Sequence, residues 1–330
     1  MAVNETPLSD RYTDWHRAQQ QAHRRQFFGR LLLTAVTALV VVVFVFPIFF
    51  WFRLSITPFR YVFVDIKQPT QFPRIDFPEV TWTWWSVILG QKTYAEAQEE
   101  QTGTRLSSGV GGGGSDGYVV APRILNSVVY GLLSTGIVIV VATFTAYALS
   151  RFETRGKQNV VFFIISTRFM PPVAVVLPLL LIYREIGWYD TRHGIFLAHV
   201  VINLPLAILL IKSFFDDVPR DLDEAAMVDG CTRFGAFWRI VARYVTPGIA
   251  AAAVLSFIFS WNEFIFTLYM ARSPEFRTIP VQMTTFDASA GPTEWGLLAA
   301  AGTAAMVPVF IFILFVQRYL IRGLTLGAVK

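Results

Sequence analysis

Charge and cysteine are both scarce in this sequence of 330 residues. Charged residues make up 15% of it, against roughly 25% in a typical soluble domain, which excludes an ordinary water-soluble protein. The single cysteine, Cys231, excludes an intramolecular disulfide and a cysteine-based metal site. Lys and Arg together outnumber Asp and Glu by 28 to 23. In a membrane protein such an excess usually marks cytoplasmic loops, so it indicates membrane lipid and no nucleic acid as a partner.

Motifs for catalysis and cofactor binding are missing as well. No G-x-x-x-x-G-K-[ST] sequence is present, and residues 109–114 match a dinucleotide motif only because the segment is almost all glycine. His193 and His199 lack a carboxylate or cysteine at metal-ligand spacing. We therefore expect no catalytic residue, no metal and no cofactor in this chain.

Long apolar segments are what the sequence does contain. A membrane-spanning helix needs about 20 predominantly apolar residues. Six segments meet this requirement, namely residues 31–52, 124–150, 159–183, 194–211, 247–270 and 295–317. They predict an all-α membrane protein with six transmembrane helices. Bulky residues follow the first segment where a cleavage site would need small ones, so we interpret that segment as a retained anchor.

The distribution of Lys and Arg predicts the orientation of the spans. Basic residues concentrate in the N-terminal tail (1–30), after the second span, between the fourth and fifth spans, and in the C-terminal tail (318–330). With six spans these regions share one side, so both termini are expected in the cytoplasm. Residues 53–123 then form a long periplasmic loop, and residues 124–317 form a five-span core with a cytoplasmic loop at 214–246.

The expected outer loop has two unusual parts. Trp82, Trp84 and Trp85 are expected at the membrane interface, where tryptophan is enriched. Residues 109–115 have the composition of a flexible linker, native or engineered.

Small residues at four-residue spacing predict close helix packing in lipid. They are Gly248, Ala252, Ser256 and Ser260 in the fifth span, and Gly296, Ala300 and Ala304 in the sixth.

Polar side chains inside the spans point to a solute pathway. Arg168 lies in the third span, Asn203 in the fourth, and Glu263 in the fifth. A charge in hydrocarbon is expensive and usually faces a cavity or a partner, so we interpret these residues as lining the pathway. The alternative is that Arg168 and Glu263 form a structural ion pair or reach toward an interface.

The expected cytoplasmic loop contains a short helix, a turn and a second helix. Pro219 predicts the start of the first helix, and the acidic residues after it favour the positive end of the helix dipole. Gly230 predicts the end of this helix in the left-handed conformation. Thr232 predicts the cap of a second helix, which carries Phe234, Phe237, Trp238 and Ile240. The alternative is a simple amphipathic connector.

Four groups of residues, in this order along the chain, resemble permease subunits of ATP-binding cassette importers, in their carbohydrate-importer, MalG-like branch. They are residues 146–151, then Glu224-Ala225-Ala226 with Asp229-Gly230, Ile240 and Pro247-Gly248, then Trp261-Asn262-Glu263-Phe264, and residues 323–330. The resemblance covers residues 124–330. The family usually has proline where Arg243 stands and a small residue where Cys231 stands, and the first change concerns how the second loop helix ends.

The resemblance implies a type I ABC importer permease fold in the bacterial inner membrane. It implies as partners a second homologous permease, two ATPase subunits that carry ATP and magnesium, and a periplasmic solute-binding protein. It also implies that ATPase coupling depends on Glu224, Ala225, Ala226, Asp229 and Gly230.

The resemblance implies a second ATPase contact at the C-terminus, through Leu324, Gly327, Ala328 and Lys330. Gln317 is expected to end the sixth span, and Gly323 and Gly327 make Leu324 to Ala328 poorly suited to continuing the helix.

A sugar needs an aromatic platform and hydrogen-bonding groups, which Trp261, Asn262 and Asn203 can supply. The competing hypotheses are a stand-alone secondary transporter or channel, with Arg168 and Glu263 as a relay, and a membrane-bound enzyme.

Overall fold

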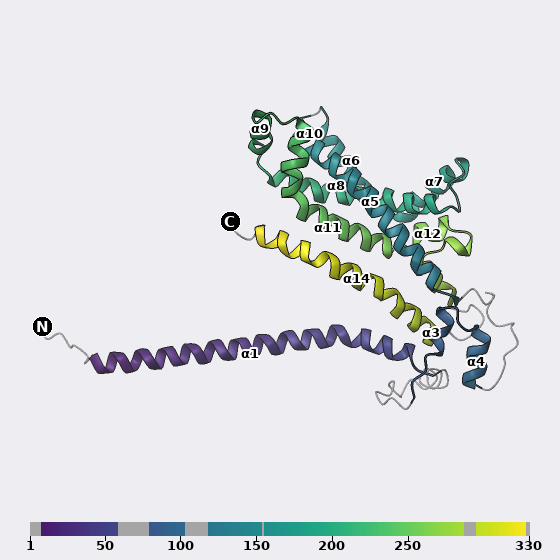
Figure 1. The fold of residues 1–330 in the computed structure, drawn as a ribbon, viewed down its shortest axis with the longest axis horizontal. Coiled ribbons are helices and arrows are strands. Elements are labelled where there is room, and N and C mark those ends of the chain that lie inside the picture. The colour runs from purple at the N-terminus through teal and green to yellow at the C-terminus, as the bar shows by residue number, and fades with distance from the viewer. Residues whose placement is uncertain (1–7, 59–78, 103–117, 154, 287–294, 328–330) are drawn as a thin grey trace. The chain divides into compact units, whose positions relative to one another are not determined.

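The computed structural model describes residues 8–58, 79–102, 118–153, 155–286 and 295–327. Every regular element among these residues is a helix, as expected for an all-α chain (Figure 1). The chain divides into two units, Met1–Arg53 and Leu54–Lys330, which we describe separately.

The first unit consists of helix α1 (Leu8–Ser55). Its stretch Gln26–Ser55 is long and apolar enough to cross a membrane. The helix begins well before residue 31, where the apolar run starts, because the preceding residues include good helix formers such as Gln, Ala and Arg.

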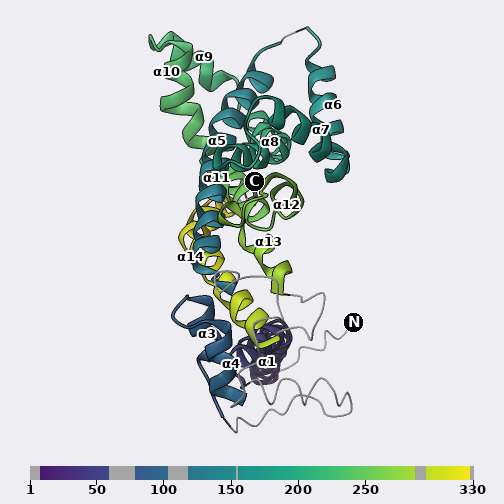
Figure 2. The same ribbon diagram turned by 90° about the vertical axis from the view of Figure 1, so that its right-hand side faces the viewer.

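The second unit is built around α5 (Ala121–Arg151), α8 (Arg192–Asp217), α11 (Ala242–Trp261) and α14 (Trp295–Gly327). Helices α5, α8 and α11 run side by side (Figures 1 and 2). Small residues allow the close approach, since Val138, Ala142 and Ala146 are fully buried. A Cβ atom added to Gly248 would lie 2.3 Å from the Phe214 ring, so the predicted small-residue contact of the fifth span is confirmed.

The expected third span is broken in two. Helices α6 (Lys157–Arg168) and α7 (Pro172–Glu185) meet at an angle of 100° (Figure 2). The break falls at Pro171 and Pro172, because proline disfavours helical geometry in the residue before it and cannot donate a backbone hydrogen bond. The described residues therefore contain five candidate spans, or six if the bent pair counts as one.

The second loop helix is not a separate element, which corrects the expectation. Helix α10 (Arg233–Ala236), a five-residue π-helical segment η2 (Phe237–Val241) and α11 form one continuous helix from Arg233 to Trp261. Arg243 can donate its backbone N–H to the helix, which a proline at this position could not do, and Pro247 lies further along inside α11.

The expected fifth span, residues 247–270, ends early. Helix α11 stops at Trp261, and a separate short helix, α12 (Ile265–Met270), follows after three residues. Three further helical turns, η3 (Pro274–Phe276), α13 (Ile279–Met283) and η4 (Thr284–Phe286), complete this region.

The tryptophans of the outer segment have different environments. Helices α3 (Thr83–Ile88) and α4 (Tyr94–Thr102) form here, and Trp84 is 2% exposed. Its indole N–H donates to the Thr57 carbonyl at 2.9 Å, and its ring packs on Gly296 of α14. Trp84 is therefore part of the core, whereas Trp82 is 59% exposed. The linker-like residues 109–115 lie outside the described residues.

The last helix also differs from the expectation. Helix α14 continues past Gln317 and through Leu324 to Gly327. Two glycines cost only about 1 kcal/mol each, which does not stop a helix that is already extended. Ala328 and Lys330 lie outside the described residues.

Candidate functional site: the loop helix and the polar core

Helix α9 (Asp221–Val228) is a short, largely exposed helix between α8 and α10. Glu224, Ala225 and Asp229 are exposed, whereas Ala226 is 2% exposed and packs inward. Gly230 adopts φ = 86°, a left-handed conformation that favours glycine and turns the chain toward α10. The predicted short helix and turn are therefore present, with the second helix forming the start of the fifth span, and four of the five residues expected to couple to the ATPases are exposed.

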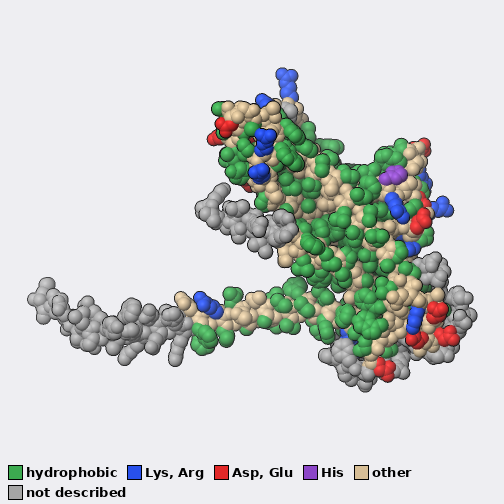
Figure 3. Space-filling view, in the orientation of Figure 1, with side chains coloured by type: hydrophobic (Ala, Val, Ile, Leu, Met, Phe, Trp, Pro, Cys, Tyr) green, Lys and Arg blue, Asp and Glu red, His purple; other side chains and the backbone are tan. Residues whose placement is uncertain are grey.

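The start of the continuous helix extends this surface. The Thr232 hydroxyl accepts a hydrogen bond from the Gly235 N–H at 3.1 Å and caps the helix as predicted. Phe234 and Trp238 are 66% and 65% exposed, while Phe237 is buried. Val228 at the end of α9 is 87% exposed. Hydrophobic, basic and acidic side chains thus share the α9–α10 end of the second unit (Figure 3).

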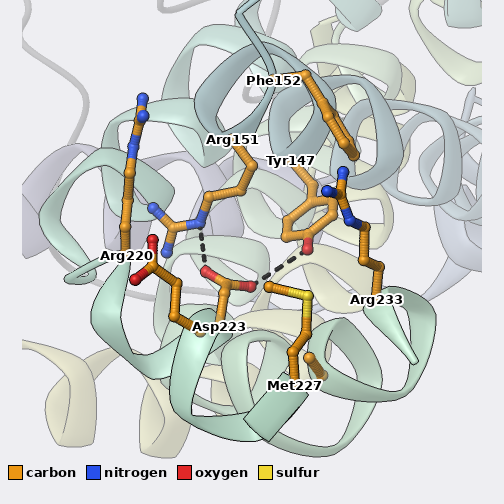
Figure 4. A pocket seen from close by; sticks show the side chains of 9 residues that line it. Tyr147, Arg151, Phe152, Arg220, Asp223, Met227 and Arg233 are labelled. Atoms are coloured by element: carbon orange, nitrogen blue, oxygen red, sulfur yellow. Dashed lines mark hydrogen bonds and ion pairs between the residues drawn. The ribbon is translucent and has the colours of Figure 1, made fainter. Parts of the chain in front are cut away.

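A hollow of about 180 Å³ lies behind α9 (Figure 4). The Asp223 carboxylate forms an ion pair there with Arg151 Nε at 2.8 Å. The Tyr147 hydroxyl donates to the same carboxylate at 3.2 Å. Tyr147 and Arg151 are four residues apart on α5, so their side chains leave the same face of that helix. The sequence reasoning missed this cluster, although the i, i+4 spacing of Tyr147 and Arg151 was visible.

Two more arginines line the hollow and each has its own contact. Arg220 reaches Glu153 at 3.4 Å and the Ser150 carbonyl at 3.3 Å. The Arg233 guanidinium lies 5.7 Å from the centre of the Phe152 ring. These contacts hold both side chains around the buried Asp223–Arg151 pair.

The predicted pathway residue Asn203 lies inside the helix bundle. Its amide donates to the Ser260 hydroxyl at 3.0 Å, and Ser260 bonds to Ser134 at 2.8 Å. These two hydrogen bonds connect α8, α11 and α5. Asn203 is 2% exposed and Trp261 is 5% exposed, so neither opens onto a pathway in this structure. Buried polar groups seek partners, and Asn203 finds them on neighbouring helices.

Glu263 lies in the break between α11 and α12 and caps the start of α12. Its two carboxylate oxygens each accept a backbone N–H at 3.1 Å, from Phe266 and Thr267. They thereby satisfy the free donors at the start of α12. His199 Nε2, fully buried, lies 3.0 Å from the Thr267 hydroxyl and 3.7 Å from Glu263.

Arg168 and Glu263 do not form the ion pair that was the structural alternative. The exposed Arg168 guanidinium lies over the Phe259 ring, 5.3 Å from its centre. Asn262 is exposed and donates to the Ile258 carbonyl at 2.8 Å.

Comparison with known proteins decides the family. Residues 138–326 match the family described as the binding-protein-dependent transport system inner membrane component. The chain belongs to this family. This permease is 35% identical to the trehalose transport system permease protein SugB of Mycobacterium tuberculosis, over 65% of this chain and 78% of that protein.

Further similarities cover more of the chain. This permease is 26% identical to the diacetylchitobiose uptake system permease protein DasC of Streptomyces coelicolor, over 93% of this chain and 99% of that protein. A crystal structure of a bacterial ABC transporter for the acidic polysaccharide alginate matches with a TM-score of 0.65 and 18% identity, over 96% of this chain and 99% of that chain. The permease shares the fold of that transporter chain.

Family membership confirms the resemblance seen in the sequence. It assigns the chain to the inner membrane and to a transport system that depends on a binding protein. A stand-alone transporter and a membrane-bound enzyme are therefore disfavoured.

Proposed function

We propose that this chain is a permease subunit of an ATP-driven importer of a sugar or a sugar-like solute. The permeases that it resembles are named for trehalose and diacetylchitobiose, which supports a carbohydrate solute. A periplasmic solute-binding protein delivers the solute, and this chain forms the pathway together with a second, homologous permease. ATP and magnesium are held by two ATPase subunits, and this chain carries no cofactor.

The exposed helix α9 is the observation that carries the coupling role. It presents the Glu224 carboxylate beside the small side chain of Ala225, so a partner surface can approach closely. Its ends are defined by Pro219 and the left-handed Gly230, which keep the eight-residue helix short. We place this helix in the cytoplasm, against the ATPase pair, with Asp229 and Gly230 at the rim of the contact.

Two further parts of the proposal concern the solute pathway and the C-terminus. Arg168, Asn262 and the break at Glu263 lie next to exposed surface, and we assign them to the pathway between the two permeases. Asn203 and Trp261 pack behind these pathway residues, inside the helix bundle. The end of α14 and the residues beyond it, with Leu324, Gly327, Ala328 and Lys330, form a second contact with the ATPases.

Replacing Glu224 tests the coupling role. A charge-assisted hydrogen bond at an interface contributes roughly 2 kcal/mol, so Glu224→Ala is expected to reduce ATP-dependent uptake at least tenfold. Uptake of labelled trehalose is measured in proteoliposomes that contain the transporter and its binding protein. If trehalose is not taken up, labelled diacetylchitobiose is the second probe.

The matched control is Glu185→Ala, which removes an equally exposed carboxylate at the end of α7. Glu185→Ala is expected to leave uptake within twofold of wild type, and immunoblotting shows equal amounts of both variants in the membrane. Equal uptake by the Glu224 and Glu185 variants would reduce α9 to a passive connector.

A further inference from the structure

The backbone bends on both sides of helix α9. Val218 ends α8 in an extended conformation, and Gly230 turns the chain at φ = 86° on the other side. Only Asp223 and Ala226 of its eight residues are buried. With a bend at each end and so small a buried face, the position of α9 depends on the few side-chain contacts that it makes with its neighbours.

The Asp223 carboxylate makes the buried side-chain contact between α9 and α5, beside the more exposed contacts of Arg220 just before the helix. It receives the Arg151 guanidinium at 2.8 Å on one oxygen and the Tyr147 hydroxyl at 3.2 Å on the other (Figure 4). The side chains of Arg151 and Asp223 are 7% and 12% exposed, so solvent screens the pair little. The hydrogen bond from Tyr147 gives the contact a direction and the ion pair with Arg151 adds charge attraction, so the two together hold α9 near the end of α5.

The Tyr147 side chain is itself held in place by its neighbours. The Tyr147 ring packs against Phe215 of α8 and Phe237 of η2, at 5.5 Å and 4.7 Å between ring centres. The Tyr147 hydroxyl is therefore fixed where three elements meet. About 25 Å along α5 from Arg151, Ser134 joins the hydrogen-bonded chain to Ser260 and Asn203.

We propose that Asp223, Arg151 and Tyr147 form a latch that ties α9 to α5, so that a displacement of α9 by the ATPases moves α5 with it. The three are positioning residues, because Glu224 and its neighbours make the partner contact. The proposal rests on the coupling role proposed above. Without the latch, α9 keeps only the contacts of Arg220 and the packing of Ala226, and less of the movement reaches the bundle.

The transporter assembled in proteoliposomes with its ATPases and binding protein provides the functional test. Asp223→Asn keeps an acceptor for Tyr147 but removes the charge that pairs with Arg151. It is expected to reduce labelled trehalose uptake at least tenfold while ATP hydrolysis without solute stays within twofold. Asp221→Asn makes the same change at an exposed position of α9 and is expected to leave uptake within twofold.

A double variant separates a latch from a merely stabilising pair. Leaving one buried charge alone destabilises a protein, whereas replacing both partners by apolar side chains is often neutral. Asp223→Leu with Arg151→Met is therefore expected to assemble well and still fail in uptake. Arg151→Lys, which keeps the charge, is expected to retain most of the uptake. Normal uptake by the double variant would overturn the proposal.

A distance measurement tests the latch without any transport. Spin labels are placed at Ala148 of α5 and Val228 of α9, both exposed, in a Cys231→Ser background. The distance distribution is expected to be narrow in this background, to broaden with Asp223→Asn and to stay narrow with Asp221→Asn. Unchanged distances with Asp223→Asn would overturn the latch.

Uptake without ATP by the wild-type complex would overturn the proposed function. The spin-label distances would still decide whether Asp223 holds α9 against α5.

Discussion

Neighbouring carboxylates on α9 face opposite environments. Asp223 is buried and paired with Arg151, whereas Glu224 is exposed and makes no ion pair among the described residues. Successive residues on a helix are about 100° apart, so one turns toward α5 while the next turns outward. The inward residue sets where the helix lies, and the outward residue is available to a partner.

Gly248, at the contact between α8 and α11, gives a prediction about a single residue. A Cβ atom at Gly248 would lie 2.3 Å from the Phe214 ring, whereas one at Gly136 of α5 meets no atom within 4 Å. Gly248→Ala should therefore destabilise the chain by about 1–3 kcal/mol. Gly136→Ala, the control, should be neutral or slightly stabilising, because alanine favours a helix.

Thermal unfolding of the purified transporter in detergent measures both variants. The Gly248 variant should unfold at a lower temperature than wild type and the Gly136 variant should not. The same unfolding temperature for Gly248→Ala and wild type would mean that Phe214 moves aside without cost.

The continuous helix from Arg233 to Trp261 links the loop surface to the bundle. At 1.5 Å per residue it is about 44 Å long, so a movement at its exposed start is carried to the break before α12. Glu263 closes that break by capping α12. Helix α9, by contrast, follows a bend, and Asp223 and Arg220 make its side-chain contacts with the end of α5.

The end of helix α14 can be tested by deletion. Deleting residues 324–330 should abolish the stimulation of ATP hydrolysis by the loaded binding protein, because it removes the proposed second ATPase contact. The apolar span Trp295–Gln317 remains intact, so the complex should still assemble. Replacing the same seven residues by Gly and Ser is the control for length. Full stimulation in the deleted protein would show that the segment is dispensable.

For the whole molecule, the distribution of Lys and Arg predicts the orientation in the membrane, with α9 and both termini in the cytoplasm and residues 53–123 outside. Cysteines at Gln91 and Val228, both exposed, are introduced singly into a Cys231→Ser background. A membrane-impermeant thiol reagent applied to intact spheroplasts should label the first and not the second. Labelling of both from outside would contradict the six-span arrangement.

Local sequence determined the helices and the loop turns of this permease. Apolar length alone marks the spans, and Pro219, Gly230 and Thr232 mark the α9–α10 turn, because each acts through the backbone of its own segment. The helix and turn that carry the proposed coupling residues were predictable for the same reason, since they depend on residues that are close in the chain.

Contacts between distant segments were decided only by the tertiary structure. Arg168 contacts the Phe259 ring and Glu263 caps α12, and Trp84 enters the core because Gly296 of α14 leaves room for its ring. Asp223 meets Arg151 because α8 returns the chain to the end of α5. Composition shows that a charged or aromatic residue needs a partner, but the packing of whole helices determines which partner it finds.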